Sequence, residues 1–112
     1  EIDTLIFDEI DTGISGRTAW RVSEQLDTLA HAHQVICITH LPQIAAMADS
    51  HYLIRKSVQN QTTVSTIRRL SEEESIQELS RMLGGVEITE TVKESAREMR
   101  ALAKSKKSGF EK

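Results

Sequence analysis

Two adjacent carboxylates, Asp8 and Glu9, directly follow the short apolar run at residues 4–7. Burying charge beside apolar residues costs roughly several kcal/mol unless something compensates, and a divalent cation is a common compensation in phosphate sites. Successive strand residues point to opposite sides, so one acid can face Mg²⁺ while the other faces an attacking water. That division suits phosphoryl transfer. The alternative is a pair of solvated or helix-capping acids, and the acid pair alone does not separate the two.

A histidine, His40, directly follows a second apolar run at residues 34–39. If both runs are strands of one parallel sheet, their carboxyl ends share an edge, where ligands of open α/β folds bind. An imidazole there can hydrogen-bond a terminal phosphate or the attacking water. A histidine at a strand end can equally be a cap or a surface residue. Its combination with Asp8 and Glu9 favours the functional interpretation.

The elements that would position these side chains can be read from hydrophobic spacing. Two buried parallel strands and a crossover helix form a strand–helix–strand unit, followed by a short helix after Pro42, an antiparallel pair at one edge of the sheet and two closing helices. Helical spacing of Ala19, Val22, Leu26 and Leu29-Ala30 predicts the buried stripe of the first helix, and Trp20 beside it is interpreted as packing. The expected ranges are strands 2–7, 34–39, 52–54 and 62–69, and helices 17–33, 42–48, 72–83 and 89–103.

The composition is that of a folded, non-fibrous protein of 112 residues, with 38% hydrophobic residues, 28% charged residues and one proline. No apolar run approaches the roughly 20 residues that span a bilayer, and no signal peptide is visible, so we expect a cytoplasmic protein without membrane contact. Cys37 is the only cysteine, which fits a reducing compartment and a small buried filler. The net charge of −3 gives no overall field that attracts nucleic acid. The chain begins inside an expected strand, which suggests a fragment.

The order of these parts resembles a known family. The run TLIFDEIDTGISG at residues 4–16 resembles the Walker B motif and D-loop of ATP-binding-cassette ATPases of the SMC-like group, and ITHLPQIA at residues 38–45 resembles their switch-histidine segment. A later MLGG at residues 82–85 agrees with it. Together the similar segments cover most of positions 2–103. The resemblance implies an α/β fold, the C-terminal part of a P-loop NTPase head.

Carried to these positions, the resemblance implies that Asp8 supports Mg²⁺, that Glu9 polarises the hydrolytic water and that His40 senses the γ-phosphate of ATP. The D-loop would lie across a dimer interface beside the nucleotide. Its residues here are Asp11, Thr12, Gly13, Ser15 and Gly16. Many members end this loop in aspartate where this chain has Ser15, so a role that needs a carboxylate there is in doubt.

The chain contains no Gly-x-x-x-x-Gly-Lys-Ser/Thr loop and no Leu-Ser-Gly-Gly-like signature. The resemblance therefore implies three partners: an N-terminal Walker A lobe of the same protein, a second head in a homodimer, and DNA bound through the full-length protein. The implied function is ATP hydrolysis coupled to double-strand break repair and recombination, in the cytoplasm at the nucleoid. This chain alone is expected to bind ATP poorly. The alternatives are a non-catalytic docking or dimerisation module with the same fold, and another SMC-like head that partners a nuclease.

The remaining candidates have simpler interpretations. His31, His33 and His51 have no cysteine partners, so we do not expect a zinc site. The basic residues of 68–69 and of the tail can touch DNA phosphates, but exposed, solubilising charge is the preferred interpretation. We divide the chain into a lobe at residues 1–103 and a basic, flexible tail at residues 104–112.

Overall fold

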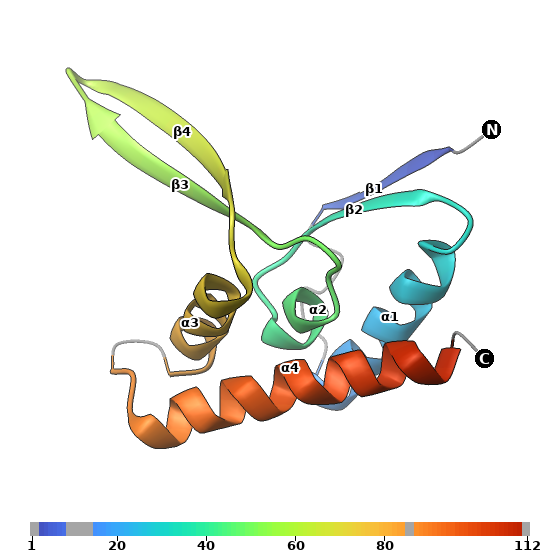
Figure 1. The fold of residues 1–112 in the computed structure, drawn as a ribbon. Helices are drawn as coiled ribbons and strands as arrows, with labels where there is room; N and C mark the ends of the chain where they lie inside the picture. The colour runs from blue at the N-terminus through green and yellow to red at the C-terminus, as the bar shows by residue number, and fades with distance from the viewer. Residues whose placement is uncertain (1–2, 9–14, 85–86, 111–112) are drawn as a thin grey trace.

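The structure is a computed structural model that describes residues 3–8, 15–84 and 87–110. Helices form one layer, and two separate pairs of strands rise from the same side of it (Figure 1). The elements in chain order are β1 (Thr4–Asp8), α1 (Gly16–Leu29), β2 (Gln34–Ile38), α2 (Pro42–Ala46), β3 (Tyr52–Gln59), β4 (Thr62–Arg69), α3 (Glu72–Gly84) and α4 (Glu90–Phe110). None of the helices within these ranges is long and apolar enough to cross a membrane.

The first two strands form the expected parallel pair, joined by α1. Their register runs from Thr4 opposite Gln34 to Asp8 opposite Ile38. Parallel strands need a crossover, and α1 supplies it in a strand–helix–strand unit. The prediction of this unit is confirmed.

The antiparallel pair is confirmed, but its expected position is wrong. Among the described residues, β3 and β4 pair only with each other and form a ribbon separate from β1 and β2. The two connecting residues, Asn60 and Gln61, both have positive φ, at 50° and 65°, as in the tight turns that match strand twist. The turn sets the register of the ribbon, which runs from Gln59 opposite Thr62 to Tyr52 opposite Arg69.

The core lies between the helices. It contains Ala45, Ala46 and Met47 around α2, Leu79 of α3, and Ala96 and Ala103 of α4. Trp20, Ile76, Met82 and Met99 pack against it, so the interpretation of Trp20 as a packing residue is confirmed. The small residues on α2 and α4 let the helices approach closely, and the larger side chains of α3 fill the space between them.

The buried stripe of α1 differs from the expected one. Ala19 is buried as predicted, but the stripe continues through Ser23 and Asp27, while Val22 and Leu26 are only half-buried. Both polar groups have partners: the Ser23 hydroxyl donates to the Trp20 carbonyl at 2.6 Å, and Asp27 accepts from Lys107 Nζ at 2.5 Å. Hydrophobic spacing missed this face because a buried polar group is stable where it is hydrogen-bonded.

The last helix also extends further than expected. We predicted an end near Ala103 and a flexible tail beyond it, whereas α4 continues to Phe110. Lysines of this segment bind carboxylates on other elements: Lys104 reaches Glu72 at 3.2 Å, and Lys106 reaches Glu24 at 2.6 Å. These ion pairs hold the segment against the body, which its low hydrophobicity did not indicate.

Candidate functional site

The parallel register brings the first acid and the histidine to one edge of the sheet. Asp8 ends β1 opposite Ile38, the last residue of β2, and His40 follows two residues later in a bend. Both side chains are exposed. The geometric expectation that these residues share the carboxyl edge is therefore met. This edge, together with the beginning of α1, is called the candidate site below.

One face of the parallel pair is open, and Asp8 lies on it. Exposure alternates along both strands, and the exposed positions include Ile6 at 67%, Ile36 at 44% and Ile38 at 38%. The half-buried positions, such as Phe7 and Cys37, point the other way. The expectation of two fully buried strands is thus wrong, because among the described elements nothing covers the second face. Cys37, on the other face, is only half-buried, so its interpretation as a buried filler is also wrong.

The beginning of α1 contains Ser15 and Gly16, the two residues of the predicted D-loop that the structure describes. Ser15 is the N-cap: its Oγ accepts from the Thr18 backbone N–H at 3.4 Å and donates to Thr18 Oγ1 at 3.2 Å. The short polar side chain therefore fits a capping role at this helix terminus. Gly16 opens the helix beside Gln43 of α2, where an added Cβ would lie 2.9 Å from the Gln43 Nε2 atom.

Gln43 is the residue that sequence reasoning overlooked. It lies between the two halves of the site, since its amide group would meet a Cβ added at Gly16 and it follows His40 by three residues. Its Oε1 atom is buried and has no hydrogen-bond partner among the described atoms. A buried amide oxygen without a donor is costly, so such groups call for an explanation. The only sequence signal that could have identified Gln43 as a site residue was its position shortly after His40.

Four predicted site residues, Glu9, Asp11, Thr12 and Gly13, lie outside the described residues. The structure thus describes Asp8, Ser15, Gly16 and His40 of the predicted set. Asp8 and His40 share the sheet edge, while Ser15 and Gly16 begin the helix that follows β1.

The described residues of the site can supply only part of the coordination shell of Mg²⁺. Among the described residues, no three histidine, cysteine or acidic side chains lie together as a metal cluster. Mg²⁺ in nucleotide sites is held by one or two carboxylates, waters and phosphate oxygens, so the exposed Asp8 carboxylate suffices as one ligand. The sequence lacks the glycine-rich loop and lysine that would hold the phosphates.

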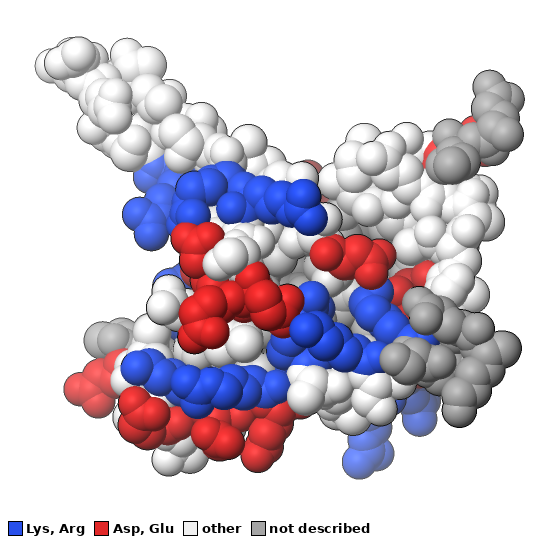
Figure 2. Space-filling view, viewed as in Figure 1, with Lys and Arg blue, Asp and Glu red and all other residues white. Residues whose placement is uncertain are grey.

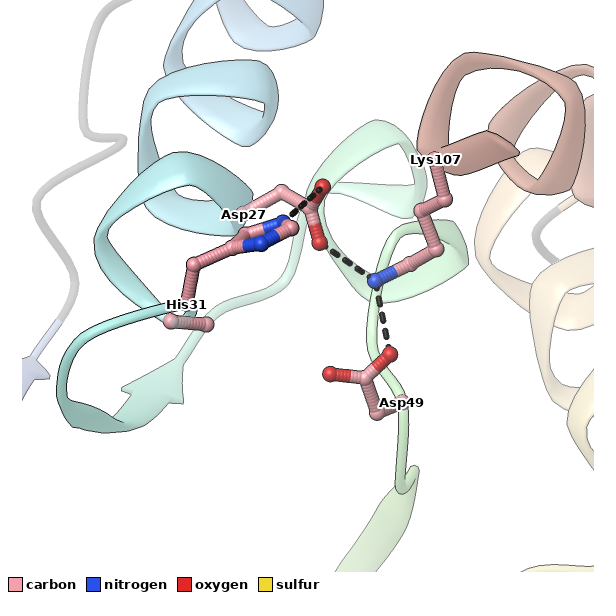
Figure 3. A pocket seen from close by; sticks show the side chains of 5 residues that line it. Asp27, His31, Asp49 and Lys107 are labelled. Atoms are coloured by element: carbon pink, nitrogen blue, oxygen red, sulfur yellow. Dashed lines mark hydrogen bonds and ion pairs between the residues drawn. The ribbon is translucent and has the colours of Figure 1, made fainter. Parts of the chain in front are cut away.

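A second cluster of charged residues lies away from this edge. Lys107 Nζ donates to Asp27 at 2.5 Å and to Asp49 at 2.8 Å, and His31 Nε2 lies 3.8 Å from the other oxygen of Asp27 (Figure 3). Burial opposes the charge on Lys107, but the two carboxylates outweigh it and raise the pKa of the ammonium group. The cluster joins α4 to α1 and to the segment before β3, which is a structural role.

The histidine before β3 is also held by the body of the protein. His51 Nδ1 lies 2.7 Å from the Ser75 hydroxyl of α3. Burial lowers the pKa of His51, against the opposing field of Glu78, so the neutral imidazole is favoured. This pair packs the base of the ribbon onto α3.

Comparison with known proteins identifies the class. No protein-family model matches the chain. Over most of its length, however, the chain is similar to curated bacterial proteins that are described by their names as DNA repair proteins. It is homologous to the C-terminal part of these much longer proteins.

The relatives are RecN proteins. The chain is 43% identical over 99 residues to DNA repair protein RecN of Bacillus subtilis (strain 168), which covers 88% of the chain and 17% of that protein. It is 45% identical over 104 residues to RecN of Halalkalibacterium halodurans (93% and 18%) and 46% identical over 98 residues to RecN of Deinococcus radiodurans (88% and 17%). The chain thus spans less than a fifth of the length of the relatives it matches.

Proposed function

We propose that this chain is the Walker B-bearing, C-terminal part of an SMC-like ATPase head with the P-loop NTPase fold. The observation that carries the proposal is the parallel register, in which Asp8 ends β1 opposite the strand that leads to His40. This arrangement occurs in a chain homologous to proteins named for DNA repair. The proposed whole-protein function is ATP hydrolysis in double-strand break repair and recombination, in the cytoplasm at the nucleoid.

Each residue of the edge has a distinct proposed task. Asp8 holds Mg²⁺, which neutralises phosphate charge when it is bound. Glu9 accepts a proton from the hydrolytic water, and His40 hydrogen-bonds the γ-phosphate of ATP. The D-loop residues extend toward the second head, with Ser15 fixing the beginning of α1 rather than supplying a carboxylate. The D-loop set is Asp11, Thr12, Gly13, Ser15 and Gly16.

The missing half of the nucleotide site would come from a Walker A lobe elsewhere in the protein. The open face of β1 and β2 supports this, because Ile6, Ile36 and Ile38 leave an apolar surface beside Asp8. Contiguous exposed apolar surface marks an interaction site. A lobe that covers this face would bring its phosphate-binding loop to the same edge as Asp8 and His40.

The test is Glu9→Gln in the full-length protein. Removing a general base lowers the rate of the chemical step by roughly 10²–10⁴-fold. We expect steady-state ATP hydrolysis to fall by at least about 100-fold, while binding of a fluorescent ATP analogue is retained. Glu73→Gln removes one charge from an exposed position on α3 and should leave both measurements unchanged.

Unimpaired hydrolysis by Glu9→Gln would contradict the general-base role. A full-length protein that neither binds nor hydrolyses ATP would contradict the ATPase proposal as a whole. It would favour the docking or dimerisation module, which keeps the head fold without the chemistry.

A further inference from the structure

The β3–β4 ribbon has a charge distribution unlike that of the rest of the chain. Its strands contain four basic residues, Arg55, Lys56, Arg68 and Arg69, and residues 52–69 contain no acidic residue. The remaining residues include ten lysines and arginines against seventeen acids, a net charge of −7. Clustering of cations on one element of an acidic chain is the electrostatic pattern of a nucleic-acid contact.

The ribbon also has an accessible shape. It projects from the helical layer, and basic side chains gather along its lower part, while its tip is uncharged (Figures 1 and 2). All four basic residues are exposed. With eight residues in each strand, the ribbon is about 25 Å long, at roughly 3.3 Å per residue. Two-stranded ribbons of this kind can lie along a nucleic-acid backbone or enter a groove.

The register distributes the cations over both faces. Arg55 and Arg68 belong to one face, and Lys56 and Arg69 belong to the other. Arg68 is engaged by Glu74 of α3 at 2.5 Å, whereas no ion pair within the described part of the chain engages Arg55, Lys56 or Arg69. Around Arg55, the same face carries exposed hydroxyl and amide groups, which are common phosphate ligands. These are Ser57, Gln59, Thr62 and Thr66.

We propose that the β3–β4 ribbon is a nucleic-acid contact of this protein, with Arg55, Lys56 and Arg69 binding backbone phosphates. The proposal rests on the proposed DNA-repair function and names the surface that would serve it. The competing occupant is a protein partner on the face of Ile54, Val58 and Ile67, which are exposed by 48%, 74% and 68%. Cores of protein interfaces are depleted in charge, whereas here Lys56 and Arg69 alternate with those apolar residues, which favours the polyanion.

The experiment compares two triple variants of the full-length protein by fluorescence anisotropy with a labelled duplex of arbitrary sequence. Arg55→Gln, Lys56→Gln and Arg69→Gln together remove the ribbon cations. Lys93→Gln, Arg97→Gln and Lys104→Gln remove the same charge from α4. Each lost phosphate contact lowers the slope of log affinity against log salt by about 0.9. The ribbon variant should lose two to three units of slope and roughly 10- to 100-fold in affinity, while the α4 variant should bind like the parent.

A variant that keeps the charge, Arg55→Lys with Arg69→Lys, should bind the duplex with most of the parent's affinity. A thermal melt of each variant tests whether misfolding causes a loss of binding. Equal losses in both triple variants would overturn the proposal, because net charge would then explain the binding. Unchanged DNA binding in the ribbon variant would also overturn it, and an altered oligomeric state with Ile67→Ser would then indicate a protein partner. Nucleotide-free DNA binding does not require ATP hydrolysis, so this test can fail or succeed independently of Glu9→Gln.

Discussion

The helical layer and the strand pairs of this molecule differ in how completely they bury their apolar side chains. Leu79, Ala46, Ala96 and Ala103 are fully buried between helices, and no other part of the protein is needed to cover them. By contrast, the strands expose isoleucines and valines on open faces, up to 74% for Val58. The helices thus share a buried core, although Leu29, Leu83 and Leu102 on their outer faces are exposed by 37–48%. The strands are an unfinished surface, and both the candidate site and the basic ribbon lie there.

Ion pairs show the same division. Arg100 of α4 donates to Glu72 of α3 at 2.9 Å and to the backbone carbonyl of Ala48 at 3.0 Å, so it joins α4 to α3 and to the end of α2. The hydrogen bond from Arg100 is the main reason that the pKa of Glu72 is lowered. In the candidate site, Asp8 and His40 instead remain exposed. The charged residues between the helices are thus engaged in ion pairs and hydrogen bonds, whereas those at the candidate site remain accessible.

The largest expected effect tests the buried helical core directly. Leu79→Ala removes a fully buried side chain from the centre of the helical core. Loss of transfer energy and the cavity left behind should lower the free energy of unfolding by about 2–5 kcal/mol, measured by denaturant unfolding of the chain. Ile6→Ala, at a position 67% exposed, should cost under about 1 kcal/mol. Equal costs at the two positions would contradict the contrast between the layers.

Local sequence signals predicted the elements well but not their environment. The runs before Asp8 and His40 were correctly assigned as parallel strands. Burial of the strands was predicted wrongly. A continuous apolar run predicts a strand that is buried on both faces, but among the described elements one face of β1 and β2 is uncovered.

The candidate site could be predicted only in part. The positions of Asp8 and His40 directly after two apolar runs were sufficient to predict that they lie at one sheet edge, because parallel strands end at the same edge. The approach of Gln43 to Gly16 depends on how α1 and α2 pack, and no periodicity encodes that. The buried Asp27 was missed for a related reason, since its partner Lys107 is 80 residues away in the chain.

An intermediate effect is expected where α4 is anchored to α1. Lys107→Met leaves the Asp27 carboxylate, whose side chain is 5% exposed, without its cation. We expect a loss of about 2 kcal/mol in the free energy of unfolding, less than the full cost of orphaning a buried charge, because Lys107 is 17% exposed. Asp49→Asn changes the outer partner, which is 76% exposed, and should cost under about 1 kcal/mol.

The pH dependence gives this anchor a second test. The folded-state pKa of Lys107 is raised, so the stabilisation is complete below the ordinary lysine pKa of about 10.4 and is lost as the pH rises through the higher folded-state value. Stability curves of the parent chain and of Lys107→Met should therefore converge above that range. A difference that stays constant into strong alkali would mean that Met disrupts packing rather than removes charge.

The smallest expected effect concerns the junction of the two regions, where the ribbon meets α3. The Ser71 backbone N–H donates to Glu74 at 2.9 Å, and Arg68 donates to it at 2.5 Å, which together lower the pKa of Glu74 to about 2. The carboxylate thus favours the folded state above its ordinary pKa of about 4.3, and this contribution is lost as the pH falls toward 2. Glu74→Gln should lower the melting temperature slightly at neutral pH and flatten its decrease between those pH values. Glu73→Gln, one position earlier and exposed, should keep the parent's pH profile; if it flattens the profile equally, the effect comes from general charge on α3 and not from the bond between Glu74 and the ribbon.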